Sequence, residues 1–254
     1  MPHTRITTTF CIGVGVAATL VSTLLPAGAG ASEHVVLESG ALWQSRNDVR
    51  IPGDSGDRFA LDDITGAGPF LHTRVTVNFA LAERHSLRLV YAPLTISESG
   101  VLSEPVAFAG ENFEAGPVRA RYQFNAPRVT WRYALSERDD RRLWIGFTGL
   151  VRDAEVHLRQ DGRSARDTDI GFVPLLHFAG EYALTPRWQL EFDFDGLAAP
   201  QGRAFDLGVR LAYQLDADWQ LFGGYRMLEG GVDNDNVYNF AWFNYLTIGA
   251  TRHF

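Results

Sequence analysis

The segment from residue 182 to 196, YALTPRWQLEFDFDG, alternates between large apolar and polar side chains once its turn is passed. In WQLEFDFD, residues 188, 190, 192 and 194 are aromatic or leucine, and the residues between and after them are Gln, Glu or Asp. A period of two residues predicts a β-strand with one apolar and one polar face. Such a strand fits a soluble β-sandwich or the wall of a transmembrane barrel.

The same pattern recurs in three other segments, which supports the barrel. They are YQLDADWQLFGGYRM at 213–227, FALAERHSLRLVY at 79–91 and YALSERDDRRLWIGF at 133–147. Each reads as two strands joined by a tight turn, with an aromatic residue just before the turn and usually another just after it. Transmembrane barrels carry aromatic girdles at both membrane–water interfaces. The four hairpins therefore predict strands whose apolar face contacts lipid.

The first 31 residues read as a cleavable secretory signal. Arg5 precedes the uncharged run FCIGVGVAATLVSTLL, which is followed by the small-residue series AGAGA. We expect cleavage after Ala31 and a mature domain over residues 32–254. An N-terminal membrane helix is the alternative, but glycines within the run and its helix-breaking tail disfavour it. Cys11 lies inside the run, so the segment is not a lipoprotein signal.

The rest of the chain has no cysteine, so no disulfide stabilises it. The formal net charge of −7 becomes −8 without Arg5, and all 23 basic residues are arginine. This acidic chain has no basic stripe for nucleic acid. No apolar stretch after residue 31 approaches the ~20 residues of a membrane helix. A closed barrel is then the way to span a membrane, because lipid cannot satisfy open strand edges.

The alternation between turns predicts an all-β, closed, antiparallel, up-and-down barrel of about ten strands, each near the ~9–11 residues that span a bilayer. Eight strands is the alternative, because the section 98–118 contains the partly apolar VAFAGENF. The ten predicted strands are 34–46, 69–82, 86–97, 118–135, 142–156, 172–184, 187–196, 204–215, 218–228 and 242–254.

The predicted connections alternate between short and long, as periplasmic turns and extracellular loops do in outer-membrane barrels. A soluble sandwich predicts no such asymmetry between its two ends. The short connections are 83–85, 137–141, 185–186 and 216–217, and the long ones are 47–68, 98–117, 157–171, 197–203 and 229–241.

Parity along the strands predicts which side chains face lipid and which face the lumen. In the fourth strand the inward set changes parity between Arg121 and Arg128, and we expect a bulge at Ala126-Pro127 to accommodate the change. The first strand is predicted to turn Glu38, Gln44 and Arg46 inward. The predicted lipid face comprises Val75, Val77, Phe79, Leu87, Leu89, Tyr91, Val129, Trp131, Tyr133, Trp188, Leu190, Phe192, Phe194, Leu207, Val209, Leu211 and Tyr213.

The inward side chains predict a salt-bridge network across the lumen. Bases dominate strands two to five and acids dominate strands six to eight, so closing a narrow barrel brings opposite charges together. Arginine suits this role, because its guanidinium bridges two carboxylates and stays charged when poorly hydrated. The predicted network comprises Arg74, Arg119, Arg121, Arg128, Arg132, His177, Glu181, Glu191, Asp193, Asp195, Asp206 and Arg210.

The chain ends in NYLTIGATRHF, with Phe254 on an alternating last strand. This ending resembles the insertion signal of outer-membrane barrels, and the mature chain resembles small Gram-negative outer-membrane β-barrel proteins without matching a characterised subfamily. Arg252 departs from the apolar or aromatic residue that such proteins commonly carry there. The resemblance implies export to the outer membrane, contact with its lipid and lipopolysaccharide, and recognition of the last strand by the barrel-assembly machinery. A barrel closes its own edges, so we expect a monomer.

Some small outer-membrane barrels are hydrolases, including lipid A deacylases and omptin proteases, which makes acid and histidine sets relevant. Asp193 and Asp195 share one strand face, and His157 follows Asp153 and Glu155. Any polar barrel wall supplies such pairs, and parity alone brings no nucleophile to a base, so no catalytic residue is assigned. For His177 we expect a hydrogen bond to Glu181 or an arginine in the lumen.

No metal site or cofactor is assigned. The acidic segment DNDN, residues 233–236, offers oxygen ligands but lacks the twelve-residue calcium-loop pattern, so a turn is the simpler interpretation. The leading hypothesis is a non-enzymatic outer-membrane barrel with a structural, surface-interaction or limited-transport role. A narrow solute channel, with the charged lumen acting as a selective constriction, and an outer-rim hydrolase of lipid or peptide are the alternatives.

Overall fold

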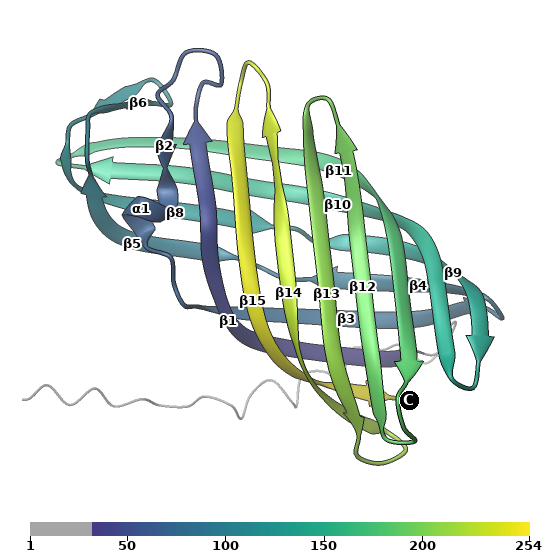
Figure 1. Ribbon diagram of the computed structural model, residues 1–254. Helices are drawn as coiled ribbons and strands as arrows, with labels where there is room; N and C mark the ends of the chain where they lie inside the picture. The colour runs from purple at the N-terminus through teal and green to yellow at the C-terminus, as the bar shows by residue number, and fades with distance from the viewer. Residues whose placement is uncertain (1–31) are drawn as a thin grey trace, which may run out of the picture. The chain divides into compact units, whose positions relative to one another are not determined.

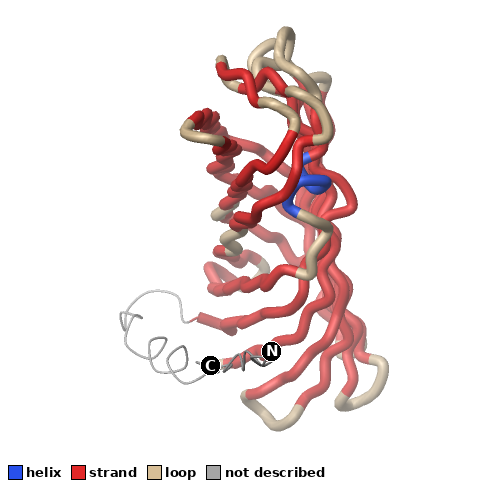
Figure 2. Tube along the Cα trace, turned by 90° about the vertical axis from the view of Figure 1, so that its left-hand side faces the viewer, coloured by secondary structure: helices blue, strands red, loops and turns tan. Residues whose placement is uncertain are grey.

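Antiparallel strands run almost end to end through residues 32–254, the part of the chain that the computed structural model describes (Figures 1 and 2). The predicted signal, residues 1–31, lies outside the described residues. The main strands are β1 (Ser32–Arg50), β3 (Phe70–Ala82), β4 (His85–Tyr91), β5 (Thr95–Leu102), β8 (Gly116–Asn125), β9 (Arg128–Arg138), β10 (Arg141–Gln160), β11 (Arg163–Ala183), β12 (Trp188–Ala199), β13 (Gly202–Gln214), β14 (Trp219–Asp233) and β15 (Tyr238–His253).

Four short elements lie in the connections: β2 (Phe59–Ala60), α1 (Leu61–Thr65), β6 (Val106–Phe108) and β7 (Glu111–Phe113). In the part of the chain that the structure describes, no helix has the length and apolarity needed to cross a membrane.

The strands form one closed barrel. Each pairs antiparallel with its neighbour in sequence, and β15 pairs with β1 from His34↔His253 to Arg50↔Tyr238. Two of the ten wall strands are each built from two pieces, β4 with β5 and β8 with β9. β10 accordingly pairs first with β9 and then with β8. The prediction of a closed barrel of ten antiparallel strands is confirmed.

Several predicted long loops were wrong, because the strands continue through them. The predicted loop 157–171 is a hairpin whose turn is Asp161-Gly162, with φ of 47° and 84°. Two consecutive residues with positive φ join antiparallel strands tightly, because the turn matches the strand twist. The predicted loops 197–203 and 229–241 are likewise mostly strand, since β12–β13 and β14–β15 extend into them. The charged side chains in these segments indicate that the strands are surrounded by water, and they do not indicate that the strands end.

Replacing Gly162 with alanine is expected to destabilise the β10–β11 hairpin by about 1 kcal/mol, because a Cβ is disfavoured in the left-handed region. No atom lies within 4 Å of the position that the alanine Cβ would take, so the cost is conformational. Gly223→Ala is the matched control. Its Cβ meets only the Thr247 carbonyl oxygen at 3.8 Å. Urea midpoints and protease cleavage at the hairpin tip measure the difference, and equal effects of the two changes would contradict the interpretation.

The polarity of the two barrel faces inverts along the strands. We call the end of the barrel with the predicted short connections, such as that between β11 and β12, the lower end. Towards this end, the outward face is apolar, as at Trp188 and Leu211, and the inward face is polar. Higher up, Val118, Ala120 and Tyr122 point inward and are buried, and the polar residues of the same strand point outward. This is expected where a wall leaves an apolar medium for water.

This inversion corrects the predicted placement of Arg119 and Arg121. Even-numbered residues face inward on both sides of Pro127, so no parity change occurs there. Arg119 is exposed, and Arg121 Nε lies 3.3 Å from Glu155 Oε1 on the outer face of β10. The surrounding medium changes along this strand, and in the sequence this change produces the same pattern as a shift of register would.

Arg46 was also predicted inward and points outward. A register shift between Gln44 and Arg46 in the β1–β15 ladder inserts one residue, so the residues after it change sides. Asn47 and Val49 take the inward positions and are fully buried.

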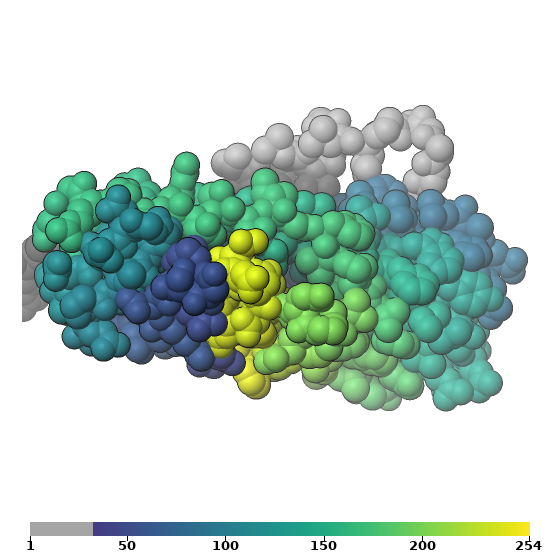
Figure 3. All heavy atoms as spheres, turned by 90° about the horizontal axis from the view of Figure 1, so that it is seen from above, coloured from purple at the N-terminus to yellow at the C-terminus, as the bar shows by residue number. Residues whose placement is uncertain are grey.

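The interior of the upper barrel is a hydrophobic core that includes helix α1 (blue in Figure 2). Leu61 and Ile64 of the helix pack in this core with Leu42 of β1. The Gln44 amide Nε2 donates to Thr65 Oγ1 at 2.9 Å, which ties the helix to β1. The helix and its flanking residues thus fill the space between β1 and β5, where β3 does not reach. From above, the purple end of β1 lies between the yellow tip of β14–β15 and teal segments (Figure 3).

Candidate lumen site

Asp206 of β13 contacts three arginines at mid-height in the lumen. Its Oδ2 lies 2.8 Å from Arg128 Nη1 and 3.4 Å from Arg74 Nη1, and its Oδ1 accepts a hydrogen bond from Arg226. Arg128 (β9) and Arg74 (β3) each lie four strands from β13, in opposite directions around the barrel. All four side chains are buried. Asp206 therefore joins opposite walls of the barrel.

Asp193 extends this layer of charges. Its carboxylate lies 3.3 Å from Arg88 Nη2 and 3.2 Å from Arg226 Nη2. Arg226 Nε is 3.7 Å from Glu38 Oε1, and the same oxygen lies 3.2 Å from His72 Nε2. Arg226 thus meets three carboxylates, which is the multiple pairing that a buried guanidinium requires.

Asp195 forms the third part of the layer. Its carboxylate lies 3.1 Å from Arg128 Nη1 and 2.8 Å from His177 Nδ1, and it accepts a hydrogen bond from Thr148 Oγ1 at 2.7 Å. His177 has no exposed surface. Its partner is therefore Asp195 on the neighbouring strand, and the expected bond to Glu181 or an arginine was wrong. We name this set, which is buried except for the partly exposed Asp193, the ion layer: Glu38, His72, Arg74, Arg88, Arg128, His177, Asp193, Asp195, Asp206 and Arg226.

Other residues of the predicted network lie nearer the lower end or outside the lumen. Glu191 pairs with Arg210 on the adjacent strand, and Glu181 pairs with the half-exposed Arg142. Arg132 is buried without an ion pair in the described structure.

Arg132 donates instead to Ser86 Oγ at 3.2 Å, and its guanidinium lies 5.2 Å from the centre of the Trp144 ring. Arg119 and Arg121 lie on the outer face, as described above. Of the predicted set, the ion layer therefore contains the three aspartates, His177 and two of the six arginines, Arg74 and Arg128.

Arg88 and Thr148 belong to the site and were absent from the sequence-based interpretation. Arg88 lies between Leu87 and Leu89, both assigned to the lipid face, so alternation alone places it inward. Thr148 follows the exposed Phe147 in the same way. Alternation therefore marks both positions as inward, although each is a single polar residue between apolar or small neighbours.

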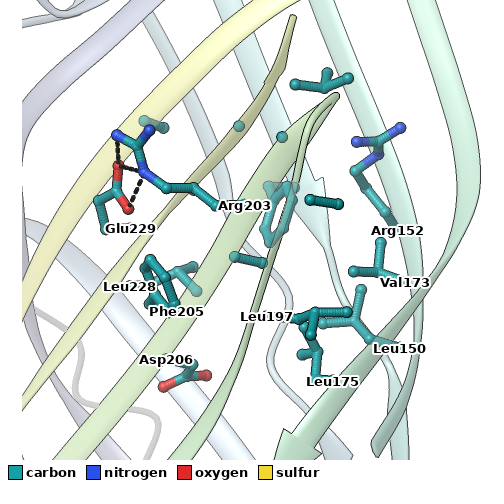
Figure 4. A pocket seen from close by; sticks show the side chains of 18 of the residues that line it. Leu150, Arg152, Val173, Leu175, Leu197, Arg203, Phe205, Asp206, Leu228 and Glu229 are labelled. Carbon is teal, nitrogen blue, oxygen red and sulfur yellow. Dashed lines mark hydrogen bonds and ion pairs between the residues drawn. The ribbon is translucent and has the colours of Figure 1, made fainter.

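Little free space remains around the ion layer. A cavity of about 40 Å³ borders Arg88 and Asp193, and one of about 20 Å³ borders Arg74 and Asp206. On the same measure of volume, a cavity of about 10–15 Å³ has room for one water molecule. A larger cavity of about 320 Å³, with mostly apolar lining, lies above the layer and ends on Arg128 and Asp206 (Figure 4).

The residues considered for hydrolysis do not meet. His157 Nε2 lies 2.9 Å from Ser164 Oγ and accepts from Arg159 Nε at 3.1 Å on the exposed extension of β10. Burial lowers the pKa of His157, and the Arg159 guanidinium lowers it further. Asp193 and Asp195 lie in the lumen with arginine and histidine partners. No nucleophile, base and acid therefore converge on one open site among residues 32–254.

Within the described residues, no group of three or more His, Cys, Asp or Glu side chains is arranged to hold a metal ion. In the segment 233–236, Asn234 Oδ1 accepts the backbone N–H groups of Asn236 and Val237, both at 3.0 Å. The side chain stabilises a turn between β14 and β15. Phe254 follows β15 with its ring largely exposed, and its role in insertion stays a prediction.

Comparison with known proteins concerns the fold. No protein-family model matches the chain, and no curated protein matches it. Among solved structures, the outer membrane protease OmpT from Escherichia coli is 12% identical, with a TM-score of 0.51 over 88% of this chain and 97% of that one.

Two further structures align less well. They are Ail of Yersinia pestis (6% identity, TM-score 0.39, 89% of this chain and 100% of that one) and neisserial surface protein A (11% identity, TM-score 0.37, 89% and 100%). The structural neighbours are outer-membrane β-barrel proteins. At such identities the likeness concerns the fold alone.

Proposed function

We propose that this chain, which has the fold of outer-membrane β-barrels, is a non-enzymatic outer-membrane barrel that does not conduct solutes and serves at the cell surface. The observation that carries the proposal is the set of contacts that Asp206 makes with Arg74, Arg128 and Arg226 across the lumen. These contacts occupy the cross-section that a pore would leave to water.

The physical case against a pore rests on burial and space. A conducting lumen keeps its charged side chains in water, where an ion pair contributes little. Here Arg74, Arg128 and Asp206 are each at most 4% exposed, so their charges depend on one another and not on water. The two cavities within the layer, of about 40 and 20 Å³, have room for only one to a few waters each, and the larger cavity above ends on Arg128 and Asp206. A solute would have to break several buried ion pairs to pass.

The surface role is supported by the upper part of the barrel. Its outward face is polar, as Arg119 and Arg121 show, and its interior is packed around α1. A rigid extension of this kind suits contact with other molecules outside the membrane. Contact with lipid and lipopolysaccharide, recognition of the last strand by the assembly machinery and a monomeric state remain part of the proposal.

Single-channel recording tests the proposal. Residues 32–254, refolded and inserted into a planar bilayer, are expected to stay silent. The double variant Arg74→Ala with Arg128→Ala is expected to show brief openings, because it removes two side chains from the ion layer and joins the cavities beside it. Arg203→Ala on the outer face is the control and is expected to stay silent. Steady, ion-selective conductance of the unmodified protein would overturn the proposal in favour of a narrow channel.

A further inference from the structure

The barrel wall separates between β11 and β12 in its upper part. The ladder between these strands ends at Leu176↔Gly196. Above that pair, β11 continues to Arg163 and pairs with β10, while β12 runs into its own hairpin with β13 (Figure 1). Among residues 32–254, none pairs with this edge of β11 between residues 171 and 175. We call the space between 171–175 and 197–205 the side opening.

The local sequence agrees with an open edge. Pro174 lies two residues beyond the last β11–β12 pair, and proline, which has no N–H to donate, is tolerated where a strand edge is unpaired. The opposite side of the barrel differs, since helix α1 fills the space between β1 and β5. An unfilled opening is therefore specific to the β11–β12 side of the described chain.

The side opening leads into the cavity of about 320 Å³ (Figure 4). Inward residues such as Leu150, Leu175 and Leu228 line its interior, while Phe172 and Phe205, which belong to the outward face, also border it. Phe172 and Phe205 lie on the two sides of the side opening, so the cavity extends into that opening. The cavity thus connects the inside of the barrel with its lateral surroundings.

The mouth of the cavity, where it meets the side opening, combines aromatic and charged side chains, as is found at a membrane–water boundary. Phe172 is 70% exposed on the outside of β11. Beside the mouth, the Arg203 guanidinium is paired with Glu229, with Nε–Oε1 of 3.0 Å (Figure 4). Arg152, also beside the mouth, is paired with Asp169. Aromatic rings next to charged pairs are typical of the level at which a barrel leaves the lipid for water.

The floor of the cavity closes it from below. Arg128 and Asp206 line its lower end, and each is already paired within the ion layer. A molecule that enters from the side therefore reaches a closed end. The volume is about twice that of a ~150 Å³ apolar cavity that stays dry and binds benzene.

We propose that this cavity binds a hydrocarbon chain of a membrane lipid, which enters through the side opening. The inference deepens the proposed function and rests on it, because the ion layer forms the cavity floor. A lipid chain is the occupant that the geometry favours, since the mouth lies in the wall beside the membrane and combines apolar rings with flanking charged pairs. The chain replaces water against Leu150, Leu175 and Leu228, which is favourable for each apolar surface covered.

Photocrosslinking tests the site. The refolded chain, residues 32–254, is placed in vesicles of phosphatidylcholine that carries a diazirine on one acyl chain, and adducts are mapped by mass spectrometry. We expect adducts on the inward residues Leu150, Leu175 and Leu228 besides those on the lipid-facing Leu211. Adducts confined to outward residues would overturn the proposal.

Two variants and one control sharpen the result. Ala204→Trp places an indole in the cavity and is expected to abolish the inward adducts. Val209→Trp makes the same kind of change on the lipid face of β13 and is expected to leave them unchanged. If Ala204→Trp does not fold, Leu150→Ala enlarges the cavity and is expected to increase the inward adducts on Leu175 and Leu228. Inward adducts that respond to neither cavity variant would overturn the site.

Conductance of the same samples separates this proposal from the proposed function. Inward adducts in a silent barrel support both. Inward adducts in a steadily conducting barrel support the lipid site and overturn the sealed lumen. A silent barrel without inward adducts overturns the lipid site and leaves the sealed lumen supported. Displacement of the inward adducts by added toluene, with outward adducts retained, would support an apolar cavity open to exchange with free molecules.

Discussion

Replacing Asp206 with alanine is expected to destabilise the barrel by about 3–5 kcal/mol, the cost of removing one partner from a buried ion pair. The change leaves Arg74 and Arg128 facing each other without the carboxylate that both contact, and Arg226 loses one of its three acids. Because all of these groups are buried, water cannot replace the lost partner. Urea unfolding of residues 32–254 in vesicles, followed by tryptophan fluorescence, measures the loss.

Asp139→Ala is the matched control for this prediction. Asp139 is exposed in the turn between β9 and β10, so its replacement is expected to change stability by no more than about 0.5 kcal/mol. Equal effects of the two substitutions would show that Asp206 is hydrated in the membrane. That result would also remove the main support for a sealed lumen.

Replacing Phe243 with alanine is expected to cost about 3–5 kcal/mol, the usual loss for a buried phenylalanine. Its ring is 1% exposed and lies 5.8 Å from the Tyr122 ring between centroids, in the core of the upper barrel. Phe243 also lines the 320 Å³ cavity, so the deleted ring adds to a space that already exists. The surrounding wall cannot collapse into it, because the strands are held by their ladders.

The conservative variant Phe243→Leu keeps much of the side-chain volume and is expected to lose clearly less stability than the alanine variant. Both are measured by the same urea unfolding. Equal losses for leucine and alanine would mean that the aromatic contact with Tyr122, and not the filled volume, stabilises this part of the core. A loss below about 1 kcal/mol for alanine would contradict the packed upper core itself.

Together, these features describe a barrel with two interiors. The lower and middle lumen is held by charges such as Asp193 and Arg226 that neutralise one another, while the upper interior is apolar and contains α1. The first gives four buried arginines their carboxylate partners, and the second supplies an apolar core to residues 32–254, which contain no cysteine. The proposed lipid site lies where the two interiors meet.

The sequence by itself indicated a barrel of about ten strands, with eight as the alternative, and the side chains that face outward. Both follow from a period of two residues, which depends on local backbone geometry and not on any partner. Trp188, Leu190 and Val209 lie on the outward face for this reason, and Arg88 was available from the same argument. A closed barrel followed because, in lipid, it is the arrangement of strands in which every backbone N–H and C=O group has a hydrogen-bond partner.

Only the tertiary structure decided which charges meet, where strands end and where the wall opens. Alternation shows that Arg119 and Arg128 lie on opposite faces of one strand, but it does not show which medium surrounds each face at each height. Partners such as Arg74 and Asp206 depend on the stagger of strands around the whole barrel, which no single segment encodes. The side opening arises because β11 continues along β10 after leaving β12, a choice made by pairing between strands.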